Sequence, residues 1–216
     1  AYSSFVNGGK LIEPIFLDRI QDSEGITIFS SEKRICEKCK EISYLGNDVP
    51  KIKDNFPQIF SEETAYQITS MLEGVIKRGT GRKLKDLNLD LAGKTGTTNE
   101  NTDAWFVGFT SNLVIGVYVG HDDPKTLGKY ETGSKTAMPI FKSFITKAVK
   151  KGDARPFKVA KNIKFLVIDQ KTGRKADFGS KTTIIEAYKK NSMTKNFLFN
   201  NDLNLKTDKN NILKFY

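Results

Sequence analysis

The sequence predicts an α+β fold in which helices flank an antiparallel sheet. Three strand-like runs follow one another at residues 89–97, 103–109 and 113–120, and only short polar segments separate them. Strands with such short connections pair antiparallel, so we expect a three-stranded meander. Two segments with helical periodicity, at residues 61–78 and 139–150, each supply an apolar face that can pack against this sheet.

Composition limits the size and the partners of the chain. Its 216 residues suffice for one large domain with an appendage. The net charge of +10 could attract an anionic polymer or a membrane surface. No Lys/Arg run is long enough for a nucleic-acid arm, and the basic residues lack regular aromatic interleaving, so we expect a solvated Lys-rich face and no nucleic-acid partner. No apolar stretch has the length of a transmembrane helix, and no signal peptide is evident.

The first thirty residues predict a helix end and a hairpin. The opening AYSSFVNGGK is typical of the last turn of a helix that Gly8 and Gly9 close, which indicates a fragment of a longer protein. Residues 10–30 contain two β-rich runs around the turn DSEG, so we expect a β-hairpin there.

Residues 31–60 combine charges with Gly and Pro, and we expect an irregular connection. The segment contains a C-x-x-C pair, Cys36 and Cys39, which is half of a four-ligand zinc site. The chain's one His, His121, is far away in sequence. We therefore expect no metal here, and the pattern leaves a disulfide and free thiols both open.

Residues 61–78 form the clearest helix. Ser61 is a suitable N-cap, and Gly79 ends the pattern. The predicted apolar stripe consists of Ala65, Ile68, Met71, Leu72, Val75 and Ile76. The following stretch, residues 78–83, lacks the Gly and Lys spacing of a phosphate-binding loop, so we interpret it as a simple connection to the next strand.

The remaining elements follow from apolar spacing. Trp105 and Phe106 are expected in the core of the meander, and a second helix is expected at residues 139–150. The character of the chain changes after Arg155-Pro156, which suggests domains at 1–152 and 153–216. Within the second, residues 163–169 predict a strand and Lys171-Thr172-Gly173 a turn without a catalytic role, whereas the rest is weakly patterned.

The segment Lys94-Thr95-Gly96-Thr97 has the residue types of an anion-binding strand end. Side chains alternate along a strand, so the hydroxyls of Thr95 and Thr97 share one face and can donate to a carboxylate. Lys94 adds a cation, and Gly96 removes a side chain where another part of the chain must approach. A backbone N–H on such an edge can point at an oxyanion. An ordinary strand end with turn residues would have a similar composition, so the tripeptide alone does not decide.

The context of this segment resembles a known family. The stretches are AYSSFVNGG, TAYQITSMLEGVIKRGTG, AGKTGTTN, DAWFVGFT, VYVGHDD and TGSKTAMPIFKSF. In this order they are similar to the C-terminal half of the transpeptidase domain of class A penicillin-binding proteins, over residues 1–150. The K-T-G box is one of three signatures of these enzymes and of related β-lactamases.

The resemblance implies a serine acyl-transfer site without metal or cofactor. It implies that Lys94 assists proton transfer and charge stabilisation, and that Thr95 and Thr97 hold the terminal carboxylate of a D-Ala-D-Ala stem peptide or a β-lactam. The backbone N–H of Thr97 would form half of the oxyanion hole. Gly96 and Thr98 complete the predicted substrate-binding set.

The nucleophile of such a site is not found in this chain. The family needs S-x-x-K and S-x-N motifs upstream of the opening segment. Ser30…Lys33 follows a strand run and Ser192…Lys195 comes after the K-T-G box, so neither match has the right context. We therefore expect this chain, taken alone, to be inactive.

The parent protein is expected to be a peptidoglycan D,D-transpeptidase beside a glycosyltransferase domain, on the inner membrane and facing the periplasm. Two alternatives remain open: a β-lactamase or D,D-carboxypeptidase of the same superfamily, and a non-catalytic basic module that binds an anionic polymer. In the family, upstream strands complete the sheet. We therefore expect the strand at 113–120 to be exposed, and the chain to dimerise, swap an element or cover that edge with its C-terminal segment.

Overall fold

The computed structural model describes residues 1–32, 34–37, 51–53, 55–150 and 155–190. The chain divides into two compact units, residues 1–161 and a second unit that begins at Asn162. The boundary predicted between residues 152 and 153 lies outside the described residues and stays a prediction. No helix in the described ranges has the length and hydropathy of a membrane span.

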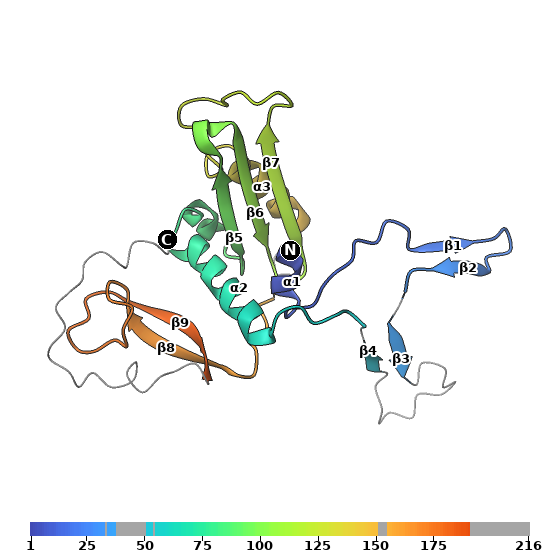
Figure 1. Cartoon of the computed structure of the whole chain (residues 1–216), viewed down its shortest axis with the longest axis horizontal. Coiled ribbons are helices and arrows are strands. Elements are labelled where there is room, and N and C mark those ends of the chain that lie inside the picture. Colours follow the sequence, from blue (N-terminus) through green and yellow to red (C-terminus); the bar gives the residue numbers. More distant parts are fainter. Residues whose placement is uncertain (33, 38–50, 54, 151–154, 191–216) are drawn as a thin grey trace. The chain divides into compact units, whose positions relative to one another are not determined.

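The first unit is built on the predicted meander. Strands β5 (Ala92–Thr97), β6 (Asp103–Phe109) and β7 (Val114–Gly120) pair antiparallel in the order β5-β6-β7 (Figure 1). This order confirms that the K-T-G strand lies at a sheet edge. It begins three residues later than predicted, because Arg82–Leu87 form a 3₁₀ helix that ends at Asn88 in the left-handed conformation, with φ of 52°. The connection predicted at 78–83 therefore runs into a short helix.

One face of the sheet packs against helix α3 (Ala137–Ala148), which lies behind it in Figure 1. Phe106 is fully buried there, with its ring centroid 4.8 Å from that of Phe141. The helix begins two residues earlier than predicted. Pro139 falls in its first turn, where a missing N–H costs no intrahelical bond.

Trp105 lies on the opposite face, and its prediction as a core residue was wrong. Successive residues of a strand alternate between faces, so a buried Phe106 sends its neighbour away from α3. Trp105 remains 43% exposed and stacks on Tyr118, at 4.7 Å between ring centroids. The phenol of Tyr118 donates to Asp103 over 2.9 Å, and this hydrogen bond raises the pKa of Tyr118.

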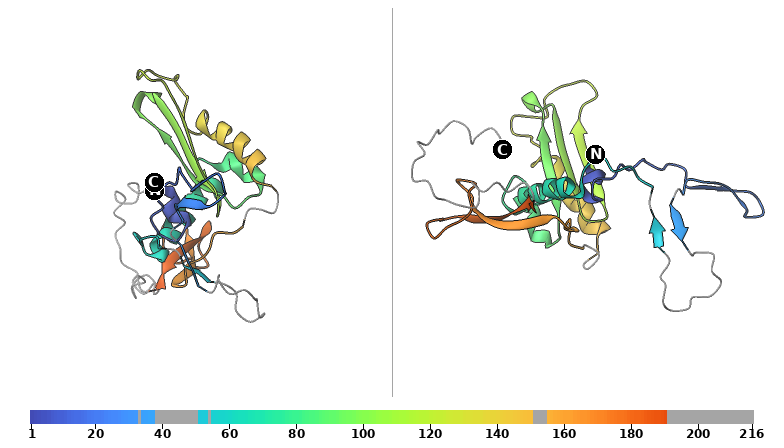
Figure 2. Two further views of the ribbon diagram at one scale, coloured as in Figure 1. Left: turned by 90° about the vertical axis from the view of Figure 1, so that its right-hand side faces the viewer. Right: turned by 60° about the horizontal axis from the view of Figure 1, so that its bottom comes forward.

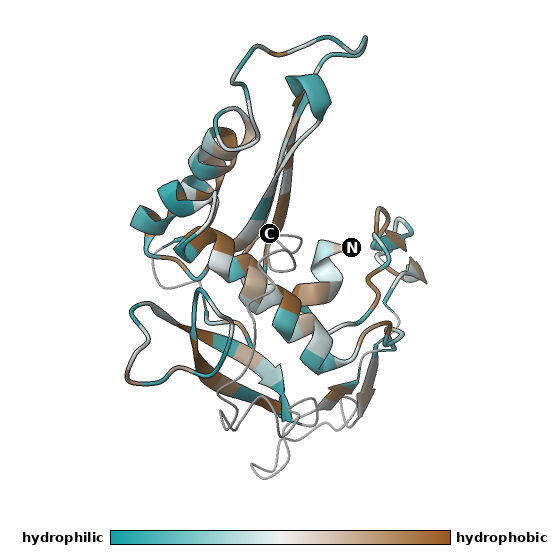
Figure 3. Cartoon of the chain, turned by 60° about the vertical axis from the view of Figure 1, so that its left-hand side comes forward, coloured by the Kyte–Doolittle hydropathy of each residue, from teal (hydrophilic) through white to brown (hydrophobic). Residues whose placement is uncertain are grey.

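Helix α2 (Glu62–Lys77) confirms the strongest sequence prediction. Ser61 caps it by accepting a hydrogen bond from the Thr64 N–H at 3.2 Å. Hydrophilic and hydrophobic residues are interspersed along the helix, as Figure 3 shows. The buried residues are Ala65, Tyr66, Thr69, Gly74 and Ile76. Met71 was predicted in the apolar stripe but is 57% exposed, because it lies about 200° around the helix from buried Thr69.

The chain start also follows the prediction. Helix α1 (Tyr2–Val6) is followed by Gly8 and Gly9, whose φ values are 80° and 89°. The N–H of Gly9 donates to the Ser4 carbonyl at 2.7 Å, as in a glycine-closed helix end. The Gly9 carbonyl in turn accepts from the N–H groups of residues 59 and 60, which ties the start of the chain to the entry of α2.

Two hairpins lie between α1 and α2. The predicted one joins β1 (Arg19–Gln21) to β2 (Thr27–Ser30). The prediction of an irregular 31–60 segment was wrong in part, because β3 (Ile35–Glu37) pairs with β4 (Lys51–Lys53). Strands of three residues are too short to show a period of two. Cys36 is disulfide-bonded, whereas the position of Cys39 lies outside the described residues.

The second unit contains an antiparallel pair (orange in Figure 2), β8 (Ile163–Asp169) and β9 (Thr183–Lys189). The first strand matches its predicted bounds, and the second was not predicted. The second K-T-G, residues 171–173, is a turn as expected. The Asp169 carboxylate accepts hydrogen bonds from the N–H groups of Thr172 (2.8 Å) and Lys171 (2.9 Å). The bond from Thr172 is the main cause that lowers the pKa of Asp169.

The two neighbouring aromatic residues of β6 provide a test of the fold. We expect Phe106→Ala to lower the free energy of unfolding by about 3–5 kcal/mol, because it leaves a cavity in the core. Trp105→Ala should cost roughly 1 kcal/mol, mainly the lost ring pair with Tyr118. Urea denaturation followed by far-UV circular dichroism measures both. Equal losses would contradict the assignment of the two faces.

Candidate functional site

The K-T-G segment lies at the surface of the first unit. Lys94 and Thr97 are exposed, and Thr95 and Gly96 are half-buried. Strand β5 pairs with β6 along its whole length, and among the described residues no other strand pairs with its second edge. Lys94 and Thr97 are therefore open to solvent, and no other strand among the described residues covers the second edge of β5.

The register of the sheet fixes which side chains share a face. Thr95 pairs with Phe106 and Thr97 with Ala104, so both threonines lie on the face that packs against α3. This agrees with the prediction that the two hydroxyls are neighbours. Lys94 belongs to the other face, and its ammonium turns back to donate to the Thr95 carbonyl at 2.8 Å.

Each of the two hydroxyls has a partner from a distant part of the sequence. The Thr80 hydroxyl lies 3.0 Å from that of Thr95, and either oxygen can be the donor. The backbone N–H of Gly133 donates to the Thr97 hydroxyl at 3.0 Å. Because the Thr97 oxygen accepts this bond, its own hydrogen is left to donate to another group.

Thr98 has a local role at the end of the strand. Its hydroxyl accepts from the Asp103 N–H at 2.8 Å and lies 2.7 Å from the Thr102 hydroxyl. Its backbone N–H donates to the Asp103 carbonyl at 3.1 Å. These contacts close the β5–β6 connection, in which Glu100 has a φ of 62°. In this structure the Thr98 hydroxyl therefore bonds within the connection.

Gly133 is a site residue that the sequence reasoning missed. A Cβ atom at this position would lie 2.3 Å from the Trp105 carbonyl oxygen and 2.5 Å from that of Gly96. Only a glycine lets the 132–134 segment approach the strands so closely. Its stretch TGSKTA is visible in the sequence, but the need for a glycine depends on a contact across 36 residues. Gly96 itself is tightly spaced, since a Cβ there would lie 3.1 Å from the Trp105 Cβ.

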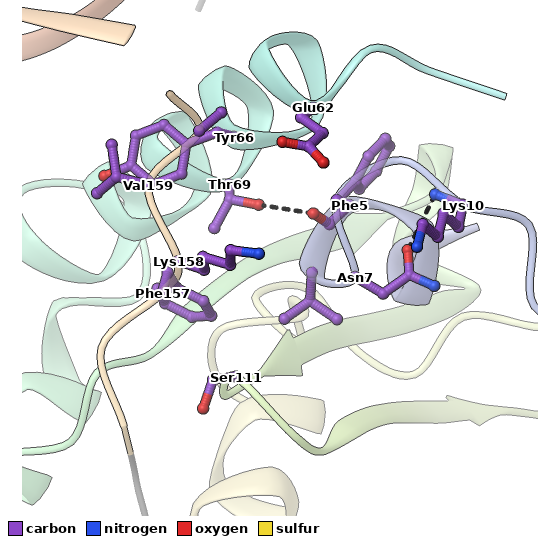
Figure 4. Close-up of a pocket in the computed structure, with 13 residues that line it drawn as sticks. Phe5, Asn7, Lys10, Glu62, Tyr66, Thr69, Ser111, Phe157, Lys158 and Val159 are labelled. Carbon is purple, nitrogen blue, oxygen red and sulfur yellow. Dashed lines mark hydrogen bonds between the residues drawn. The ribbon is translucent and has the colours of Figure 1, made fainter. Parts of the chain in front are cut away.

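A cavity of about 290 Å³ lies elsewhere in the first unit (Figure 4). Residues from α1 and the segment after it, from α2, and from residues 157–160 line it, among them Phe5, Lys10, Tyr66 and Lys158. Burial, and secondly the charge of Glu73, raise the pKa of Tyr66. None of its lining residues belongs to the K-T-G segment, so this cavity is separate from the predicted site.

The polar residues after β7 do not form a metal centre in the part of the chain that the structure describes. His121, Asp122 and Asp123 lie in an exposed connection. No group of three or more His, Cys, Asp or Glu side chains among the described residues is arranged to hold a metal ion.

Comparison with known proteins decides the family. The penicillin binding protein transpeptidase domain matches residues 1–146. The chain belongs to the penicillin-binding protein transpeptidase family. Penicillin-binding protein 1A of Rickettsia felis is 40% identical over 218 residues, and the match covers 100% of this chain and 27% of that protein. The same-named protein of Pseudomonas aeruginosa is 33% identical and is covered to the same 27%. The chain thus spans about a quarter of the length of these relatives.

A solved structure agrees with the transpeptidase assignment. The crystal structure of penicillin-binding protein 1A from Haemophilus influenzae superposes with a TM-score of 0.68 at 33% identity. The match covers 86% of this chain and 30% of that chain. The fold is accordingly a partial α+β transpeptidase fold, as the sequence predicts.

The close approach at Gly133 yields a testable prediction. We expect Gly133→Ala to lower the free energy of unfolding by about 1–3 kcal/mol, because backbone atoms on both sides must move. It should also shift the NMR amide signals of Gly96 and Thr97. Gly116→Ala on β7 is the matched control, since a Cβ there meets only a Val107 methyl carbon at 4.0 Å. Unchanged Gly96 and Thr97 signals in Gly133→Ala would contradict the role of this contact.

Proposed function

We propose that this chain is the C-terminal part of a peptidoglycan D,D-transpeptidase that cross-links stem peptides through a serine acyl-enzyme. The observation that carries this proposal is the exposed K-T-G strand edge with two hydroxyls on one face, in a chain that belongs to the transpeptidase family. A carboxylate accepts hydrogen bonds only, so paired hydroxyl donors beside a cation suit the terminal carboxylate of a stem peptide or a β-lactam.

The proposal gives each residue of the strand a role. Thr95 and Thr97 donate to the carboxylate, and Lys94 leaves the Thr95 carbonyl to stabilise charge and assist proton transfer beside the serine. The Thr97 N–H forms half of the oxyanion hole. Gly96 leaves room for the neighbouring segments to approach the strand. Thr98 fixes the end of the strand through its hydrogen bonds in the β5–β6 connection.

The nucleophilic serine, in this proposal, is supplied by sequence outside these 216 residues. The parent would then be a bifunctional enzyme with a glycosyltransferase domain, anchored in the inner membrane and acting in the periplasm, with peptidoglycan and β-lactams as its ligands. The relatives described above are penicillin-binding proteins, which favours a synthetic enzyme over a β-lactamase of the same superfamily.

Labelling with a fluorescent penicillin tests the proposal. We expect no covalent adduct on residues 1–216 alone. A chimera that joins the upstream part of the Rickettsia felis relative to this chain should form a stoichiometric adduct. In that chimera Lys94→Ala should slow acylation by about 10²- to 10⁴-fold, the range for a positioned acid or base.

Lys147→Ala is the matched control, because Lys147 is an exposed cation in the last turn of α3. It should acylate at the unchanged rate. An adduct on the isolated chain would place the nucleophile inside it. A folded chimera that never reacts, or one in which Lys94→Ala acylates normally, would refute the proposal.

We further propose that the chain alone self-associates through β7, which pairs with β6 only among the described residues. Unpaired strand edges promote such pairing. Sedimentation velocity should show a dimer that Gly116→Lys converts to a monomer, because a charged side chain on an exposed edge position opposes strand pairing. A monodisperse wild-type monomer would exclude this association.

A further inference from the structure

The connection after α2 delivers a third hydroxyl to the proposed carboxylate site. Thr80 lies between two glycines in this connection, and its hydroxyl is 3.0 Å from that of Thr95. Fifteen residues separate the two threonines in sequence. The contact therefore depends on how the connection folds against the sheet.

The two glycines fix the connection onto the last turn of α2. The N–H groups of Gly79 and Gly81 donate to the Val75 carbonyl, at 3.1 and 3.0 Å. A Cβ at Gly79 would lie 2.9 Å from the Val75 Cα, and one at Gly81 would lie 2.7 Å from the Ile76 Cδ1. Ile76 is 4% exposed and belongs to the hydrophobic core. The position of Thr80 is thus fixed relative to the core by α2, because the connection already lies in close contact with the last turn of that helix.

The direction of the hydrogen bond follows from the chemistry of the ligand. Two neighbouring hydroxyls share one hydrogen, and either can give it. A carboxylate accepts only, so Thr95 must direct its own hydrogen to the ligand when one binds. Thr80 must then donate to Thr95. The pair can adopt this arrangement only if position 80 carries a hydroxyl.

We propose that Thr80 is a positioning residue, which orients the Thr95 hydroxyl as a donor to the substrate carboxylate. This inference rests on the proposed function. The Gly133 N–H holds Thr97 in the equivalent state, because a backbone amide can only donate. Both threonines of the strand therefore present hydrogens to the ligand, and each is held by a group from another segment.

Thr80 should consequently act on selectivity for a free carboxylate. Hydrogen bonds to a charged acceptor are stronger than neutral ones, and a donor behind them strengthens them further. A substrate whose carboxylate is esterified loses this charge and gains little from an oriented Thr95. Replacement of a residue that merely supported the fold would change the acylation rates with the free acid and with the ester by the same factor.

The experiment compares acylation of the chimera by a penicillin and by its methyl ester. We expect Thr80→Val to lower the second-order acylation rate constant of the free acid about 3- to 10-fold, the equivalent of one hydrogen bond. With the methyl ester, Thr80→Val should react at the same rate as the wild-type chimera does with that ester. Thr80→Ser, which restores a hydroxyl, should recover the rate of the free acid.

Thr146→Val is the matched control, because its hydroxyl donates to the Lys142 carbonyl on the exposed side of α3. It should leave both rates unchanged. Equal losses with acid and ester in Thr80→Val would overturn the inference, as would a normal Thr80→Val acid rate in a chimera whose Thr95→Val variant is slowed. A wild-type chimera that does not react would refute the proposed function itself.

Discussion

The packing of Phe106 on Phe141 is the contact on which the first unit depends. It holds the middle strand of the sheet against α3 and so decides the face of every residue that pairs with that strand. Because Thr95 is opposite Phe106 in the register, the same contact orients the K-T-G strand. The accessible edge is then a consequence of the order β5-β6-β7, in which the middle strand alone has two partners within the described residues.

Two approaches of backbone to backbone complete the arrangement around this strand. At Gly133 the 132–134 segment lies directly on the β5–β6 pair, and at Gly79 and Gly81 the connection after α2 lies on its own helix. Glycine allows such approaches because it has no Cβ. The Thr80 hydroxyl and the Gly133 N–H are thereby brought to the strand that carries the Thr95 and Thr97 hydroxyls.

Local pattern sufficed to predict the elements that bury a regular face. Helix α2, the meander, β8 and the turn at residues 171–173 all have the predicted kind of structure. The errors arose where the pattern is too short or the partner too distant. Strands β3 and β4 have three residues each, and Met71 and Trp105 are apolar residues that the periodicity could not assign to a face.

The sequence identified the strand of the candidate site but not the residues that surround that strand. Side-chain alternation gave the shared face of Thr95 and Thr97, and the family resemblance pointed to Lys94. Thr80 and Gly133 were not found, because their importance lies in contacts across 15 and 36 residues. Both residues lie in stretches that carry the family resemblance, yet nothing in one sequence says which strand they contact.

The hydrogen bond of the Lys94 ammonium to the Thr95 carbonyl affects how quickly the strand can respond to an arriving ligand. The ammonium has one neutral acceptor, in a contact that is exposed to solvent. Its four-carbon stem can swing within nanoseconds. The Lys94 ammonium can thus turn from the Thr95 carbonyl toward a ligand by side-chain rotation alone, and no part of the backbone has to unfold.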